Sequence, residues 1–175
     1  MKNEACCSKY VSMNSESKEV VVDFGSGEIP HVAEYIANSY PEFYVLAMES
    51  GGFQKREKQK NLGKVLSTSG FEGKLPLKES SVDRFFASFV LGETSNDGYL
   101  KLLKEVKRVL KPKGTGFFCE AKINKEHVKK MITEANLEVV NVYSGFPKGS
   151  SWGESFNSVG KSAEEWKPIV LVVRK

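Results

Sequence analysis

Short hydrophobic runs alternate along the chain with segments whose hydrophobic residues recur at helical spacing. The runs are rich in β-branched and aromatic residues and are bounded by glycine, proline or polar residues, a pattern that predicts β-strands. We predict seven strands, one beginning at Val20 and ending in an acidic residue, and the others over Glu42–Ser50, Lys64–Ser69, Val82–Leu91, Thr115–Ala121, Leu137–Tyr143 and Pro168–Val173.

Three segments have the periodicity of amphipathic helices. They cover His31–Asn38, Tyr99–Leu110 and Lys125–Ala135, and we predict that Pro112-Lys113-Gly114 stops the second one. The basic segment Phe53–Lys64 is predicted to be helical in part. Because strands alternate with helices until the last pair of strands, we expect an α/β fold. This is a doubly wound, mostly parallel seven-stranded sheet with helices on both faces and an antiparallel last strand.

Composition limits the classes of protein to which the chain can belong. With 175 residues, 40% of them hydrophobic, the chain fits one globular domain, expected over residues 20–175, after a flexible polar tail at residues 1–19. No long apolar run indicates a membrane span or a signal peptide, so we expect a cytoplasmic protein. Its three cysteines lack metal-ligand spacing, and we predict no metal site. The net charge of +4 permits an acidic partner, but nothing supports nucleic acid.

The first predicted strand leads into a glycine turn and then into a helix. Asp23 ends the strand, and Gly25-Ser26-Gly27 forms the turn. Glycines let the backbone approach a ligand closely, and a helix N-terminus offers unpaired N–H groups, so this unit favours a nucleotide-like ligand. The alternative is an ordinary strand-to-helix turn of an α/β protein.

A second acidic residue ends the second predicted strand. Glu49 lies roughly 20 residues beyond the glycine turn, a spacing at which a carboxylate can accept hydrogen bonds from both ribose hydroxyls of a nucleoside. The alternative is a surface glutamate at a strand end.

Three motifs in order carry a family resemblance. The glycine turn with Glu49 comes first, followed by Leu75-Pro76-Leu77 with Ser81-Val82-Asp83, and then by Arg108-Val109-Leu110-Lys111-Pro112-Lys113-Gly114. In this order the chain resembles the class I, seven-stranded S-adenosylmethionine-dependent methyltransferases. The resemblance implies the strand order 3-2-1-4-5-7-6, S-adenosylmethionine as cofactor, and methyl transfer to an unidentified small-molecule or protein acceptor.

The resemblance also implies roles for individual residues. Glu49 would hold the ribose, and the methionine end of the cofactor would be lined by Asp23, Gly25, Ser26 and Gly27. Two positions depart from the family pattern. Ile29 replaces the third glycine, and the acid that often contacts adenine is replaced by Phe71, which could stack on the base, with Glu72 beside it.

The acceptor side carries fewer signals. Ser88 is a predicted site residue at the end of the fourth strand, and with Glu93 it is placed to meet an acceptor. No catalytic base is assigned, and His31 is interpreted as a surface or capping residue. The segment Ser144–Lys167, with its glycines and aromatic residues, is the candidate to close over an acceptor or to dock a partner protein, because the site otherwise looks open.

Two other functions stay open at this point. The run Lys78–Asp83 is also similar to the N-terminal domain of anamorsin-like iron–sulfur assembly proteins, in which the same fold would be a non-enzymatic scaffold. A nicotinamide dehydrogenase is disfavoured because the third glycine of its motif would fall at Pro30 and the chain has no room for a substrate domain.

Overall fold

The computed structural model describes most of the predicted elements. It covers residues 19–26, 31–49, 65–69, 73–90, 95–120, 124–144 and 169–175. Along the chain the elements are β1 (Val20–Phe24), α2 (His31–Ser39), β2 (Tyr44–Glu49), β3 (Val65–Ser69), β4 (Val82–Ser88), α3 (Asn96–Val109), β5 (Leu110–Glu120), α4 (Lys125–Glu134), β6 (Glu138–Ser144) and β7 (Ile169–Arg174). The predictions for the N-terminal tail, the basic segment and most of Ser144–Lys167 fall outside these residues.

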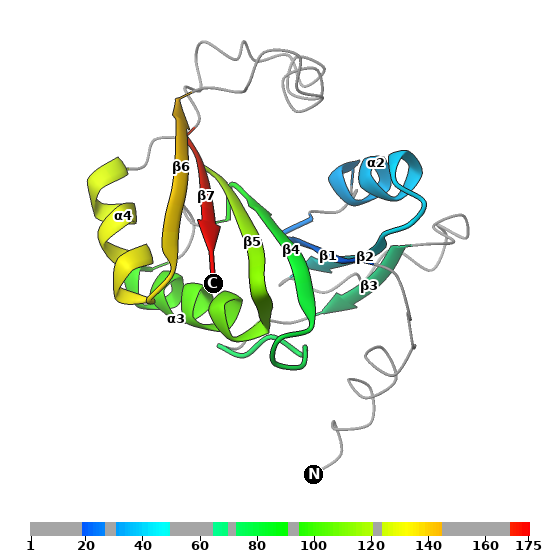
Figure 1. The fold of residues 1–175 in the computed structure, drawn as a ribbon, viewed down its shortest axis with the longest axis horizontal. Coiled ribbons are helices and arrows are strands. Elements are labelled where there is room, and N and C mark those ends of the chain that lie inside the picture. Colours follow the sequence, from blue (N-terminus) through cyan, green and yellow to red (C-terminus); the bar gives the residue numbers. More distant parts are fainter. Residues whose placement is uncertain are drawn as a thin grey trace.

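One seven-stranded sheet has the order β3-β2-β1-β4-β5-β7-β6 (Figure 1). The pairs among β3, β2, β1, β4 and β5 are parallel, whereas β7 is antiparallel to both β5 and β6. The predicted strand order and the antiparallel last strand are therefore confirmed. The last predicted strand, Pro168–Val173, corresponds to β7, which lies inside the sheet between β5 and β6.

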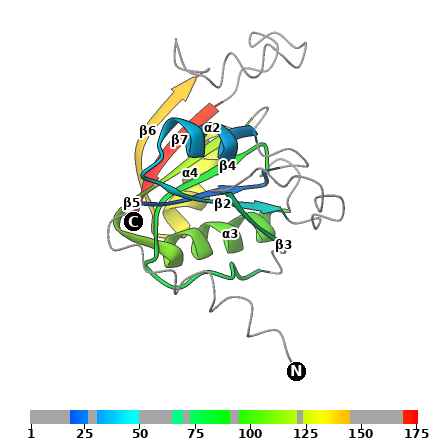
Figure 2. The same ribbon diagram turned by 90° about the vertical axis from the view of Figure 1, so that its right-hand side faces the viewer.

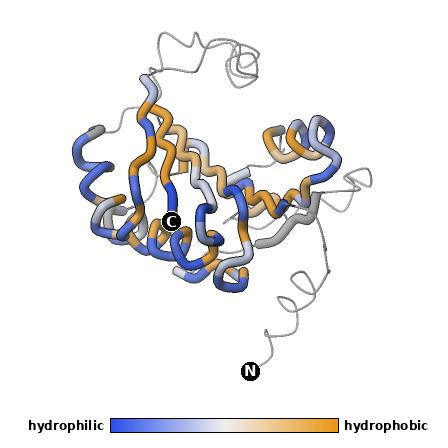
Figure 3. Tube along the Cα trace, viewed as in Figure 1, coloured by the Kyte–Doolittle hydropathy of each residue, from blue (hydrophilic) through white to orange (hydrophobic). Residues whose placement is uncertain are grey.

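Helices cover both faces of the sheet, α2 on one side and α3 on the other (Figure 2). On the first side, buried alanines and Ile36 of α2 pack against Val21 and Val45 of the central strands. The larger core lies on the opposite side, where α3 and α4 bury Leu102, Leu103 and Ile132, among others, against strands β4, β5 and β7. Hydrophobic positions accordingly concentrate in the strands (Figure 3). No helix in the described ranges is long and apolar enough to span a bilayer.

The junction between α3 and β5 differs from the prediction. The helix ends at Val109, before Pro112, and the strand already begins at Leu110, which pairs with Val82 of β4. The predicted helix end is therefore confirmed to within one residue, but the strand begins before the predicted Thr115 and includes Pro112-Lys113-Gly114. These residues form an irregular part of the strand, where Lys113 has a φ of 69° and a Cβ on Gly114 would lie 2.9 Å from the Lys111 carbonyl oxygen.

The edge strand β6 is irregular as well. Its register with β7 shifts between Val139 and Asn141, so that Val140 forms a bulge, with 42% of its surface exposed. One residue later, the Val142 N–H donates to the side-chain Oδ1 of Asn141 at 2.8 Å. A backbone donor of this edge is thus satisfied by the strand's own side chain.

Candidate functional site

The glycine turn leaves β1 at the carboxyl edge of the sheet, as predicted. Gly25 has a φ of 72°, a conformation that costs other residues energy. Its N–H and that of Ser26 both donate to the Met48 carbonyl of β2, at 2.8 and 3.2 Å. A Cβ on Gly25 would overlap the side chain of Val90. The backbone conformation and the packing of Val90 each require glycine here.

Asp23 anchors the following helix to β1. Its side chain is almost completely buried, with 2% exposed, and its Oδ2 accepts a hydrogen bond from the Ala33 N–H at 3.1 Å. Ala33 lies in the first turn of α2, where N–H groups have no partner inside the helix. The carboxylate therefore satisfies a helix N-terminus and sits at its positive end. This is a structural role that the sequence-based interpretation of Asp23 did not include.

Three buried hydroxyl groups in the described residues have no hydrogen-bond partner, that of Tyr99 in α3 and those of two serines at the ends of neighbouring strands. Ser26 follows the end of β1, and Ser88 ends β4, the strand that pairs with β1 up to Phe24 and Ala87. In the part of the chain that the structure describes, the Oγ atoms of both serines are buried and unpartnered. Buried polar groups are nearly always hydrogen-bonded in folded proteins, so two orphans at neighbouring strand ends mark a place where a ligand could supply the missing bonds.

A tight turn follows Ser88 and ends β4 three residues earlier than predicted. Phe89 has a φ of 56°, which for a bulky residue costs on the order of 1–3 kcal/mol and is most often retained at functional sites. Its N–H donates to the Cys119 carbonyl at 2.8 Å, and the next N–H, of Val90, donates to Oε1 of Glu120 at 3.1 Å. The end of β5 therefore holds the turn.

Glu120 is the residue of this edge that the sequence analysis missed. Its exposed fraction is 1%, although it carries a carboxylate. Burial, reinforced by the nearby Glu120 carboxylate, raises the pKa of the Tyr99 hydroxyl well above its usual range. The same two effects raise the pKa of the Cys119 thiol to about 12. Both groups therefore stay protonated at neutral pH and cannot serve as general bases there.

The other predicted site residues are placed only in part. Glu49 is the last residue of β2, so its backbone lies at the same edge as Asp23 and Ser88. Its side chain is outside the description, as are Gly27, Phe71, Glu72 and Glu93. Their predicted contacts with a ligand stay predictions. The structure brings the strand ends that carry Asp23, Gly25, Ser26, Glu49 and Ser88 to one edge of the sheet.

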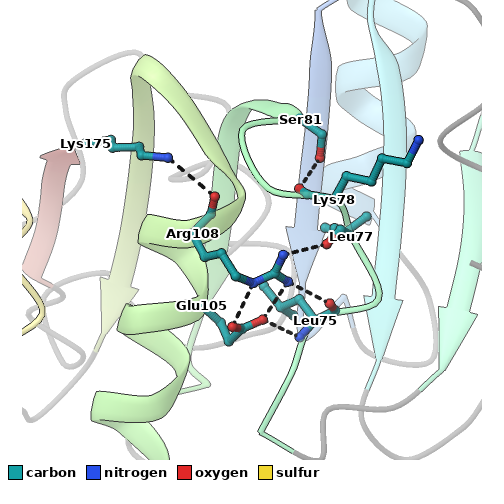
Figure 4. Close-up of polar contacts among 7 residues, drawn as sticks. All are labelled: Leu75, Leu77, Lys78, Ser81, Glu105, Arg108 and Lys175. Carbon is teal, nitrogen blue, oxygen red and sulfur yellow. Dashed lines mark hydrogen bonds and ion pairs between the residues drawn. The ribbon is translucent and has the colours of Figure 1, made fainter.

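The second and third motifs meet in a clamp at the opposite end of β4 (Figure 4). The Arg108 guanidinium donates to the Leu75 and Leu77 carbonyls at 3.0 and 2.9 Å. It also donates to both carboxylate oxygens of Glu105, at 2.8 and 2.7 Å, and Glu105 accepts from the Leu75 N–H. From the C-terminus, Lys175 Nζ donates to the Leu110 and Arg108 carbonyls. These motifs fix the chain before β4 to the end of α3 and lie away from the candidate site.

Comparison with known proteins identifies relatives. Residues 22–118, more than half of the chain, match a family model described as "Methyltransferase domain". No curated protein sequence matches the chain.

Similar solved structures share the fold at low sequence identity. One is a chain from the Haloferax volcanii complex between the Trm112 methyltransferase activator and a protein described as a methyltransferase (TM-score 0.71, 14% identity, 96% of this chain and 88% of that one). Another is a TehB-like S-adenosylmethionine-dependent methyltransferase from Corynebacterium glutamicum (TM-score 0.69, 15% identity, 98% of this chain and 86% of that one). A third is an S-adenosylmethionine-dependent methyltransferase from Aquifex aeolicus (TM-score 0.64, 18% identity, 99% of this chain and 99% of that one). At these identities the likeness shows the fold.

Proposed function

Because the chain belongs to the methyltransferase domain family, we propose that it transfers a methyl group from S-adenosylmethionine to an acceptor held at the carboxyl edge of its sheet. Open α/β sheets bind ligands where the strand order reverses, and here that point lies between β1 and β4. The glycine turn and the end of β4 meet at this point. The proposal therefore places the methionine end of the cofactor over Gly25 and Ser26 and beside Ser88, and the acceptor toward the end of β5.

The observation that carries the proposal is the pair of unpartnered hydroxyls of Ser26 and Ser88. The methionine end of the cofactor has a carboxylate, which can accept from a hydroxyl, and an ammonium group, which can donate to one. The donor and acceptor chemistry of the two serines therefore fits that end of the molecule. Since both Oγ atoms are shielded from solvent, the groups that cover them must move when a ligand binds.

The glycine turn suits a ligand without phosphate. The N–H groups of Gly25 and Ser26 already donate to Met48, and the carboxylate of Asp23 occupies an N–H at the start of α2. A dinucleotide would bring its pyrophosphate to this helix N-terminus and meet a negative charge there. This arrangement favours S-adenosylmethionine over a nicotinamide dinucleotide and extends the sequence argument against a dehydrogenase.

Little acid–base chemistry is required of the protein. The cofactor, when bound, supplies an activated methyl group with a good leaving group. The chain's own residues then have to hold the acceptor in line and exclude water, which is catalysis by positioning. Tyr99 and Cys119 are protonated at neutral pH and do not deprotonate the acceptor. The acceptor, in a small molecule or a protein, does not lose its proton to either of these two groups.

Calorimetric titration with S-adenosylmethionine and with its demethylated product tests the proposal. We expect wild-type protein to bind both, and Ser26→Ala and Ser88→Ala each to bind about 5–20-fold more weakly, which corresponds to one lost hydrogen bond of about 1–2 kcal/mol. Glu49→Ala tests the predicted ribose contact. Ser81→Ala is the matched control, because its hydroxyl donates to the Lys78 carbonyl at the far end of β4, and it should bind as wild type does.

Absence of binding at about 1 mM of either ligand, which limits the binding free energy to about −4 kcal/mol, would overturn the proposal. It would favour the scaffold function of anamorsin-like proteins. If the ligands bind, protein incubated with methyl-labelled S-adenosylmethionine and either small-molecule or protein fractions of a cell extract should label one of the two. The labelled fraction then gives the acceptor class.

A further inference from the structure

A buried carboxylate lies next to the candidate site without belonging to it. Glu120 ends β5, beside the Ser88–Cys119 pair of the β4–β5 ladder, and it is 1% exposed. Burying a carboxylate is costly unless the protein gives it hydrogen bonds. One of its bonds is to the Val90 N–H at 3.1 Å, a backbone group in the turn that follows Ser88. Glu120 thus acts on a turn whose position matters for the site.

This turn is held in an unfavourable conformation by β5. Phe89 keeps its positive φ while its N–H is bonded to the Cys119 carbonyl. Without the bonds from Cys119 and Glu120, the bulky residue would favour a conformation with negative φ. The chain direction after Ser88 therefore depends on these two acceptors.

The Phe89–Val90 turn supports the glycine turn that follows β1. The side chain of Val90 fills the space in which a Cβ on Gly25 would lie, so the two turns are in direct contact. Contacts consequently run from Glu120 through Val90 to Gly25, across the end of β4. Displacing Val90 removes the packing under the glycine turn and shifts Ser88, which directly precedes Phe89.

We propose that Glu120 is a positioning residue of the methyltransferase site, which holds the Phe89–Val90 turn against Gly25 and thereby sets the places of Ser26 and Ser88. This inference rests on the proposed function, because the property it explains is the binding of S-adenosylmethionine. The role requires a hydrogen-bond acceptor at the end of the side chain. A glutamine can supply that acceptor and an alanine cannot.

The test compares Glu120→Ala, Glu120→Gln and Val90→Ala with a matched control, Glu105→Ala. Glu105 also accepts from a backbone N–H, that of Leu75, but at the opposite end of β4. Each variant is confirmed as folded by circular dichroism and titrated with S-adenosylmethionine. We expect Glu120→Ala to bind at least about 10-fold more weakly, Val90→Ala about 3–10-fold more weakly, and Glu120→Gln within about 3-fold of wild type. Glu105→Ala should lose thermal stability but keep its affinity.

A second measurement does not depend on the cofactor. In a Cys6→Ser, Cys7→Ser background, Cys119 is the only thiol left in the chain. Its reaction with Ellman's reagent reports opening at the end of β5, to which the Phe89–Val90 turn is hydrogen-bonded. We expect at least about 10-fold faster labelling in Glu120→Ala than in Glu105→Ala, and near wild-type labelling in Glu120→Gln.

The outcomes separate the two proposals. If wild type binds no S-adenosylmethionine, the proposed function fails, and equal labelling of Glu120→Ala and Glu105→Ala then removes the positioning role as well. If wild type binds, unchanged affinity in Glu120→Ala overturns the positioning role alone. An equal loss in Glu120→Gln and Glu120→Ala also overturns it, because the amide keeps the acceptor. Should Glu120→Ala not fold, Glu120→Gln and Val90→Ala decide, and wild-type affinity in Val90→Ala contradicts the inference.

Discussion

Replacing Arg108 by alanine removes the centre of the clamp that joins the end of α3 to the chain before β4. The guanidinium makes two hydrogen bonds to the backbone carbonyls of Leu75 and Leu77 and two to the carboxylate of Glu105. In the Arg108→Ala variant the two carbonyls lose the guanidinium as their donor, and Glu105 keeps only the hydrogen bond from the Leu75 N–H. The carboxylate would then lie in a largely buried position without its counter-charge.

The magnitude follows from the exposure of the two side chains. A hydrogen bond to a charged group contributes about 1.5–3 kcal/mol when buried, and four such bonds would give an implausibly large sum. The side chains of Arg108 and Glu105 are 25% and 14% exposed, so water replaces part of what is lost. We therefore expect Arg108→Ala to lower the free energy of unfolding by about 2–4 kcal/mol, and the melting temperature by about 4–16 °C.

Stability against pH gives an independent readout. Burial alone would raise the pKa of the Glu105 carboxyl, but hydrogen bonds from Arg108 and the Leu75 N–H, with the charges of Arg108 and Lys74, outweigh it and lower that pKa. A lowered pKa in the folded state contributes stability above the ordinary value of 4.5, which is lost as the pH falls through the folded-state value. In Arg108→Ala this acid-sensitive contribution should shrink.

Urea denaturation followed by circular dichroism, at neutral pH and across the acid range, measures both effects. Lys101→Ala is the control, because it removes a positive charge from an exposed position of the same helix, and its free energy of unfolding should stay within about 0.5 kcal/mol of wild type. An Arg108→Ala protein with wild-type stability at neutral pH, or with an undiminished loss of stability in acid, would refute the reasoning.

Three further predictions concern the carboxyl edge of the sheet. Gly25→Ala should lower the free energy of unfolding by about 2–4 kcal/mol in urea denaturation, because the new Cβ combines a positive φ with overlap on Val90; adding Val90→Ala should recover part of the loss, and no recovery would contradict the packing argument. Asp23→Ala leaves the Ala33 N–H without its acceptor and should lower the free energy of unfolding by about 1–3 kcal/mol. Relative to wild type, hydrogen exchange should become faster in α2 and stay unchanged in α4. In the Cys6→Ser, Cys7→Ser background, Cys119, whose thiol pKa burial raises to about 12, should react with Ellman's reagent at mildly alkaline pH only when the native structure opens. Stability should fall as the pH rises from about 9 toward 12, because the unfolded thiol ionises first; rapid labelling in this background would argue against the burial.

The strands were predictable because each is a compact run of β-branched and aromatic residues between turn signals. Their ends were less so. Val82–Leu91 was predicted as one strand, but Phe89 turns the chain because Cys119 and Glu120, some 30 residues away, bond its N–H and the next one. Likewise β5 begins at Leu110 and not at the predicted Thr115, because Leu110 pairs with Val82. Both boundaries depend on contacts that no local pattern contains.

The candidate site was predictable to the extent that it lies at strand ends. Asp23, Gly25 and Ser26 were identified from an acid and glycines that follow a buried strand, and Ser88 from its place at the end of another. Glu120 shows the same signal, an acid closing an apolar strand, yet it was not singled out. Its importance depends on Val90, and that contact exists only in three dimensions.

The irregular edge strand β6 determines how the sheet ends. A sheet can be extended by another chain only where its outermost strand offers a straight, unoccupied row of donors and acceptors. The bulge at Val140 interrupts that row, and the Asn141 side chain occupies the N–H of Val142. An incoming strand would have to displace that side chain and straighten the bulge before it could pair. Despite the exposed Val140 and Tyr143, this margin of the molecule is therefore protected against strand-by-strand polymerisation.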